Sequence, residues 1–296
     1  MTRPPALFLL AAAAACLTAC ASPQISVRKV AVSQPEAVAI VTAAKRAHGQ
    51  EAFAGVRELT VHYEGQWGKV MPRIQPVLAD RDFRQGSMEK LTLSPRRIAQ
   101  EHTGPSGKKL VLRTTDKVTV SYNGAVSTDT EKRKAAALVA DAYALFLLGP
   151  FYFDRPGVIL AAAPPAVVDG QACDGILAVM QPGFGFAPED RVVLYIDRNS
   201  KLLRRVRLTL NGLDSTQGAE VDVTFREFTR IGGVLWPTDF EERVRAPFDL
   251  HAHHWKLTKL EVNRGRHAPV LSWSLPGGSS PAGAVSALRQ VRGRVN

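Results

Sequence analysis

Cysteine and histidine are the residue types in this chain whose positions point most directly to chemistry. Cys20 closes the tetrad Leu17-Thr18-Ala19-Cys20, which follows an apolar run beginning at Ala6 and a basic residue at Arg3. A basic start, a short apolar stretch and small residues before a cleavage point are typical of a secretory signal rather than of a membrane-spanning helix. The chain is therefore predicted to be exported, with Cys20 at the point where processing occurs.

The tetrad resembles the lipobox of bacterial lipoprotein signals, in which the cysteine is diacylated and the peptide before it is removed. The resemblance implies a signal peptide at residues 1–19, lipidation of Cys20 and a tether at residues 20–32. Acyl chains contribute about 0.8 kcal/mol per buried methylene, so this lipid anchor would hold the protein on a membrane. A neutral residue, Ala21, follows the cysteine. We expect the protein to be located in the cell envelope, at the periplasmic face of the outer membrane. The alternative is an ordinary secretory signal with a chance cysteine.

Histidine is clustered at one place, His251-Ala252-His253-His254. On a strand, His251 and His253 would share a face and could bind a transition metal if Asp249 joined them. No third ligand is marked elsewhere in the sequence. We therefore expect histidines at a strand edge without a metal, and no cofactor.

Motifs for covalent or phosphate chemistry are absent from the sequence. There is no nucleophile elbow, no zinc-protease helix, no phosphate-binding loop and no paired-cysteine spacing. Apart from Cys16 and Cys20, Cys173 is the one cysteine, so no internal disulfide can form and a buried apolar role is expected. We predict that the protein is not an enzyme. An envelope hydrolase assisted by a metal at His251 is the less favoured alternative.

The charge balance indicates anionic neighbours. The formal charge is +11, and removal of Arg3 with the signal leaves +10. Export separates the chain from nucleic acid, so anionic lipid head groups are the expected partners of this charge. Residues 276–296 begin with a Pro- and Gly-rich run and end with several arginines, which predicts a flexible basic tail.

Two helices are predicted to position the rest of the chain. The first covers residues 34–48, with Ser33 as N-cap and Gly49 as the left-handed residue after its end. The second covers residues 130–148, where Thr128-x-x-Glu131 has the form of a capping box and Gly149-Pro150 ends an almost wholly apolar segment.

Between and after these helices, apolar residues alternate with polar ones. Leu59, Val61 and Tyr63 are an example, and the pattern continues as far as residue 262. This alternation predicts an antiparallel meander of about nine to eleven strands with one face toward water. Residues 197–200 predict a hairpin turn. Arg205 and Arg207 are expected to meet Glu220 and Asp222 across neighbouring strands.

These elements predict an α+β domain over residues 33–275, with a single strongly curved antiparallel sheet, an unclosed β-barrel, and two main helices covering its concave face. The chain here resembles the lipoprotein-sorting superfamily of periplasmic carriers and outer-membrane acceptors (LolA/LolB-like). The residues that carry the resemblance are Ala47-His48-Gly49, Tyr63-Glu64-Gly65-Gln66-Trp67, Gly149-Pro150, Leu194-Tyr195-Ile196-Asp197 and Ile231-Gly232-Gly233-Val234-Leu235-Trp236-Pro237. An insertion at residues 157–170 and the basic tail depart from the family.

The resemblance implies binding of acyl chains, from a lipid or a lipoprotein, under a helical lid and without a cofactor. A role in lipoprotein sorting or lipid transfer would follow. Large apolar side chains on the inner strand faces and at the end of the second helix are the predicted lining: Tyr63, Leu110, Val120, Leu145, Phe146, Phe151 and Phe153. The alternative is that these residues form a filled core, in a structural lipoprotein with a protein partner.

Overall fold

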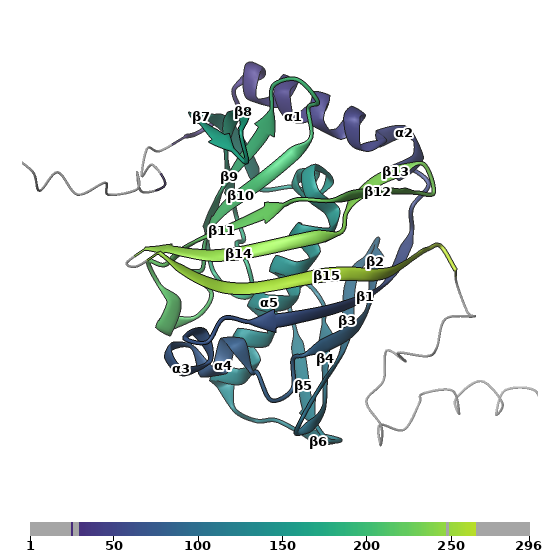
Figure 1. Ribbon diagram of the computed structural model, residues 1–296, viewed down its shortest axis with the longest axis vertical. Helices are drawn as coiled ribbons and strands as arrows, with labels where there is room; N and C mark the ends of the chain where they lie inside the picture. Colours follow the sequence, from purple (N-terminus) through teal and green to yellow (C-terminus); the bar gives the residue numbers. More distant parts are fainter. Residues whose placement is uncertain (1–24, 26–29, 247–248, 265–296) are drawn as a thin grey trace, which may run out of the picture.

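A computed structural model describes residue 25, residues 30–246 and residues 249–264 (Figure 1). The predicted signal peptide, Cys20 and the basic tail lie outside these described residues. The main sheet consists of β1 (Glu58–Trp67), β2 (Gly86–Leu93), β3 (Arg96–Gly104), β4 (Gly107–Arg113), β5 (Val118–Tyr122), β6 (Ala125–Val126), β7 (Val158–Val168), β8 (Gln171–Met180), β9 (Asp190–Asp197), β10 (Leu203–Thr209), β11 (Glu220–Phe225), β14 (Asp239–Ala246) and β15 (Leu250–Val262). A separate hairpin consists of β12 (Phe228–Ile231) and β13 (Val234–Pro237).

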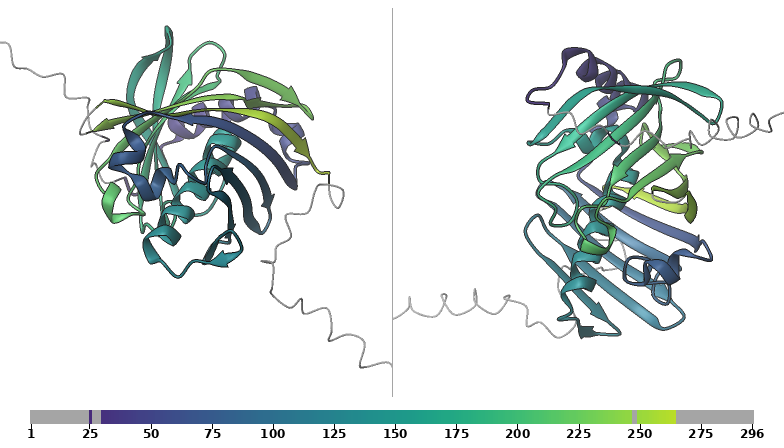
Figure 2. Two further views of the ribbon diagram at one scale, coloured as in Figure 1. Left: turned by 60° about the horizontal axis from the view of Figure 1, so that its bottom comes forward. Right: turned by 90° about the vertical axis from the view of Figure 1, so that its left-hand side faces the viewer.

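The helices are few and one of them is long. They are α1 (Pro35–His48), α2 (Gln50–Phe53), α3 (Met71–Ile74), α4 (Pro76–Ala79) and α5 (Thr130–Leu148), with short 3-10 turns η1 (Gly149–Phe153) and η2 (Asp214–Thr216). The predicted fold class is confirmed: one antiparallel sheet curves around α5 and does not close (Figure 2). The sheet has 13 strands rather than nine to eleven, because it also includes β3, β6, β7 and β14, for which the sequence shows no clear alternation.

The sheet is built from two meanders that meet at its centre. Its order is β6-β5-β4-β3-β2-β1-β15-β14-β11-β10-β9-β8-β7, so β1 pairs with β15 although about 190 residues separate them in sequence. The chain must then connect β6, at one edge, with β7, at the other. Helix α5 makes this connection across the concave face, and its 19 residues span about 28 Å.

Both predicted long helices are present, with different N-caps from those expected. Helix α1 has Gln34 at its N-cap position, and the Ser33 hydroxyl instead accepts a hydrogen bond from the Leu160 amide at 3.1 Å. The N-cap of helix α5 is Asp129, whose carboxylate accepts hydrogen bonds from the Glu131 and Lys132 amides. A carboxylate is a good N-cap because it also faces the positive end of the helix dipole.

The core lies between α5 and the concave face of the sheet. By length and hydropathy Thr130–Phe153 could span a membrane, but 94% of its apolar window is buried within the protein, so it serves here as a core helix. A smaller apolar cluster lies on the other face of β7–β9. There Ile25 and Val30, from the predicted tether, pack near Val179 and Cys173, and burial raises the pKa of the Cys173 thiol.

One predicted cross-strand charge pair is found as expected. Arg207 donates to both Asp222 oxygens, at 2.7 and 3.0 Å, across β10 and β11. Arg205 also faces Asp222, at 3.8 Å. Glu220 differs from the expectation, because its Oε1 accepts a hydrogen bond from the Ile25 amide at 2.6 Å. Glu220 therefore helps to hold Ile25 against the sheet.

Candidate functional site

The concave face of the sheet is largely filled by α5. A cavity of about 40 Å³ remains between α5 and the sheet, lined in part by Phe146, Leu208 and Leu210. A second, of about 20 Å³, lies beside Tyr63 and Tyr143. Each is large enough for water but far below the size of a typical ligand pocket. Neither of these two cavities has room for an acyl chain.

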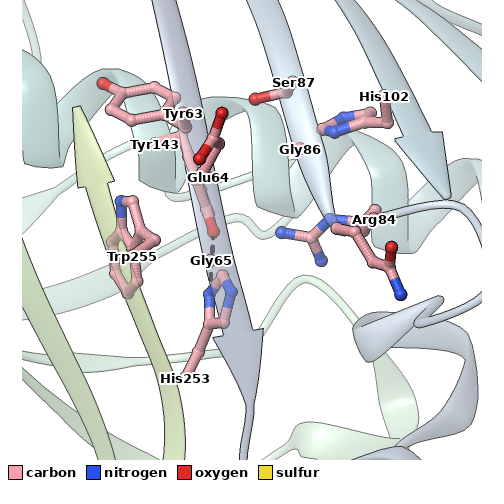
Figure 3. A pocket seen from close by; sticks show the side chains of 11 residues that line it. Tyr63, Glu64, Gly65, Arg84, Gly86, Ser87, His102, Tyr143, His253 and Trp255 are labelled. Carbon is pink, nitrogen blue, oxygen red and sulfur yellow. Dashed lines mark hydrogen bonds between the residues drawn. The ribbon is translucent and has the colours of Figure 1, made fainter. Parts of the chain in front are cut away.

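The smaller cavity is a polar pocket (Figure 3). Tyr143 of α5 contacts His253 of β15, with its hydroxyl 3.1 Å from the histidine Nδ1. His253 stacks between Trp67 and Trp255, with ring centroids 4.1 and 4.9 Å away. Gly65 leaves room for this stack, because a Cβ at that position would lie 2.6 Å from His253 Nε2. Aromatic and glycine residues thus fit together around a buried imidazole.

Burial determines the protonation of this pocket. It lowers the pKa of His102 and of His253 well below the usual value, and the positive charge of Arg84 adds to the effect. Burial raises the pKa of the Glu89 carboxyl, which accepts a hydrogen bond from the Ser87 hydroxyl at 2.9 Å. Serine, histidine and a carboxylate are therefore close together, but the serine donates to Glu89 directly. A nucleophile activated through histidine requires a different arrangement.

The expectation that His251 and His253 share one face of a strand is wrong. The pairing of β15 with β14 shifts at Ala252, so His251 is exposed while His253 is buried. Such a bulge adds one residue and shifts the alternation, so residues two apart, here His251 and His253, fall on opposite faces. His254 Nε2 lies 3.1 Å from Asp239 Oδ1. Among the described residues no group of three His, Cys, Asp or Glu side chains is placed to hold a metal.

A much larger cleft lies where α5 ends, at the side on which the sheet stays open. Its volume is about 390 Å³, which is within the range of ligand-binding pockets. We call it the rim cleft, defined by its apolar lining of Phe53, Leu93, Leu148, Phe151, Pro156 and Pro182. These residues come from α2, the end of β2, α5, η1 and the loops after η1 and β8. Both halves of the sheet therefore contribute to one opening.

The aromatic floor of the rim cleft is rigidly packed. Phe53 and Phe151 stack face to face, with ring centroids 3.9 Å apart and planes within 3° of each other. The His48 ring stands edge-on to Phe151 at 6.4 Å. Burial holds the pKa of His48 at about 4, and its Nδ1 lies 3.0 Å from the Leu235 carbonyl oxygen. The floor is therefore apolar and uncharged at neutral pH.

A buried ion pair fixes α5 beneath the open side of the sheet. The Asp141 Oδ2 atom accepts hydrogen bonds from Arg113 Nη2 at 2.8 Å and from the Gly185 amide at 2.9 Å. Arg113 Nη2 also donates to the Gly185 carbonyl at 2.6 Å. Arg113 belongs to β4 and Gly185 to the loop between β8 and β9. The carboxylate thus joins the two halves of the sheet through the helix.

The seven predicted lining residues are only partly brought together. Phe151 lines the rim cleft, Phe146 lines the 40 Å³ cavity and Tyr63 lines the polar pocket. Leu145 and Phe153 are buried in the main core, and Val120 packs with a smaller cluster against α5. These six lie on the inner side of the protein, but they line separate cavities or none.

Leu110 is on the opposite face of β4 from the one expected. It is half-buried, while Lys109, Val111 and Arg113 point inward and are buried. The inward cations are satisfied by carboxylates from elsewhere: Lys109 Nζ lies 2.6 Å from Asp80 Oδ2, and Arg113 pairs with Asp141. The hydrophobic pattern assigned the face wrongly because a strand with charged residues on its inner side has no simple apolar face.

Sequence reasoning missed most of the rim cleft. Leu93, Arg96, Arg155 and Pro182 line it, although no spacing in the sequence connects them. One signal was available in Asp141, an acid within an apolar helix, because a buried carboxylate requires a cation or hydrogen-bond donors. Its partners are Arg113 and Gly185, and Gly185 belongs to the Gly183-Phe184-Gly185-Phe186 segment.

Comparison with known proteins gives a likeness in fold. No family model matches the chain, and no curated protein matches its sequence. Among solved structures it is similar to a DUF1329 family protein from Desulfovibrio piger, with 11% identity, 77% of this chain and 94% of that protein covered, and a TM-score of 0.48. It is also similar to a LolA superfamily protein from Nitrosomonas europaea, with 10% identity, 81% and 96% coverage, and a TM-score of 0.48. Among these solved structures, therefore, is a member of the superfamily that the sequence resembles.

Proposed function

We propose that this protein binds the acyl chain of a lipid or lipoprotein in the rim cleft, as a lipid-anchored protein of the cell envelope. The observation that supports the proposal is the cleft itself, an open space of about 390 Å³ whose lining includes Phe53, Leu148 and Phe151. Apolar surface gains about 25 cal/mol for each Å² removed from water. An acyl chain would therefore be held by the burial of its apolar surface, without a cofactor or a catalytic group.

The anchor and the destination belong to the same proposal. Lipidation at Cys20 would tether the domain to the periplasmic face of the outer membrane, where acyl chains are abundant. The residue nearest to it that the structure describes, Ile25, packs against the face of the sheet opposite to α5. A protein held in this way could receive a lipid or lipoprotein and pass it to the membrane, which is the role in sorting or transfer that the fold suggests.

A second candidate function follows from the filled concave face. Helix α5 occupies the half-barrel, and two cavities along it measure about 20 and 40 Å³. A structural lipoprotein that binds a protein partner would have such a core. The two functions differ in whether the rim cleft takes up an apolar molecule.

The test is uptake of a neutral apolar dye, N-phenyl-1-naphthylamine, by the purified full chain. We expect fluorescence enhancement with the unmodified protein. Leu93→Trp fills the cleft and should weaken dye binding at least tenfold. Leu112→Trp is the matched control, because Leu112 is a half-buried leucine on the outward side of β4. If the folded protein takes up no dye, or Leu93→Trp changes nothing, acyl binding in this cleft is refuted and the structural role stands.

A further inference from the structure

Two guanidinium groups flank one aromatic ring in the wall of the rim cleft. The Cζ atoms of Arg96 and Arg155 lie 5.4 and 4.7 Å from the centroid of the Tyr152 ring. Tyr152 is buried, whereas both arginines are partly exposed and line the cleft. Arg96 opens β3 and Arg155 follows η1, so the pair is assembled from two distant segments. Stacking on a ring holds a guanidinium in place while leaving its N–H groups free to bind an anion.

The acidic groups near these arginines are already engaged. Asp154 lines the cleft, but its Oδ1 accepts a hydrogen bond from Lys45 Nζ at 2.7 Å. Asp141 lies 3.6 Å from Arg96, yet its hydrogen bonds go to Arg113 and Gly185. The wall of the rim cleft therefore keeps a net positive charge.

The two cations differ in their acidic neighbours, because Arg96 lies 3.6 Å from Asp141 while Arg155 has only neutral partners among the described residues. Its Nη2 donates to the Pro182 carbonyl at 3.1 Å, and its Nη1 lies 3.5 Å from the Tyr152 hydroxyl. Its buried Nε has no hydrogen-bond partner, and among the described residues no carboxylate lies within 4.0 Å of the group. An unpaired buried donor is costly, and the part of the guanidinium that is exposed in the cleft can bind a carboxylate or phosphate.

We propose that the ligand of the rim cleft is an anionic amphiphile, whose acyl chain lies on the apolar lining and whose carboxylate or phosphate binds between Arg96 and Arg155. This inference rests on the proposed function. The chain's own tail is a poor occupant, because residues 265–296 carry four arginines and no acidic residue. Charge complementarity therefore selects an acidic lipid or fatty acid.

The experiment compares probes that share one tail. Tetradecyl phosphate and tetradecanoate, each below its critical micelle concentration, and tetradecanol, below its solubility limit, are titrated into the purified full chain by calorimetry. Inorganic phosphate serves as a head group without a chain. We expect the two anions to bind at least tenfold more tightly than tetradecanol, and inorganic phosphate not to bind measurably. Arg96→Gln and Arg155→Gln should each remove most of this preference while leaving tetradecanol affinity unchanged.

Controls separate the possible failures. Arg133→Gln removes the same charge from an exposed position in α5 and should change nothing. Arg155→Gln leaves the Asp141 contacts intact, so it reports on the head group even if Arg96→Gln unfolds the protein. If tetradecanol binds as tightly as the anions, the anionic preference is refuted and acyl binding stands. If inorganic phosphate binds as tightly as tetradecyl phosphate, the cleft is an anion site without an acyl subsite. If no probe binds, the proposed function itself fails.

Discussion

Removing the carboxylate of Asp141 should destabilise the protein more than any surface substitution. The side chains of Asp141 and Arg113 are 2% and 4% exposed, so Asp141→Asn leaves a buried guanidinium without its counter-charge. Losing one partner of a buried ion pair costs about 3–5 kcal/mol. Arg113 keeps carbonyl acceptors at Gly185, Thr115 and Lys117, so we expect a loss near the lower end, about 3 kcal/mol. That is a large part of the 5–15 kcal/mol that holds a typical domain together.

The assay is urea unfolding followed by circular dichroism, with linear extrapolation of the free energy of unfolding. The double variant Asp141→Leu/Arg113→Met removes both members of the buried pair. Its loss should be smaller than the sum of the losses of Asp141→Leu and Arg113→Met alone, because neither member is left without the other. Asp214→Asn is the control; its carboxylate is 94% exposed and pairs with Lys134 at 3.5 Å, so stability should hardly change. A loss below about 1 kcal/mol for Asp141→Asn, or additive single losses, would refute the reasoning.

Three further predictions concern pH, backbone conformation and anchoring. The pKa of His48 is about 4 in the native state and 6.5 in the unfolded chain, so the unfolded chain binds more protons between pH 4 and 6.5. Lowering the pH from 6.5 to 4 should therefore reduce the free energy of unfolding by about 3 kcal/mol through this group. In urea titrations His48→Gln should show a smaller loss over that range; an equal loss would mean that other groups cause the acid sensitivity. Gly49→Ala should lower the melting temperature more than Gly124→Ala. Both glycines have positive φ, but only at Gly49 would a Cβ meet the backbone, 2.5 Å from the Gly233 oxygen. Equal decreases in melting temperature would contradict this clash. Cys20→Ser should move the protein from the membrane to the soluble fraction in immunoblots, and unchanged membrane binding would disprove lipid anchoring.

Features set by neighbouring residues were predicted well from the sequence. Alternation around Tyr63 indicated a strand, the apolar segment before Gly149 indicated a helix, and the turn at residues 197–200 joins β9 to β10 as expected. Asp197 Oδ1 accepts from the amides of Asn199 and Ser200, which is the local chemistry of such a turn. These features depend on sterics and hydrogen bonds within a few residues, so a single sequence contains the information.

Tertiary structure decided which segments meet and therefore where a ligand could bind. Pairing of β1 with β15, and the passage of α5 from β6 to β7, leave the rim cleft at the open side of the sheet. Leu110 faces away from α5 because Asp80 and Asp141, distant in sequence, satisfy Lys109 and Arg113 on the inner side. The sequence by itself determined most of the strands, the two long helices and the candidate lipidation site. The cleft and its arginines depend on contacts between segments far apart in the chain, and no local spacing specifies the burial and charge pairing that select those contacts.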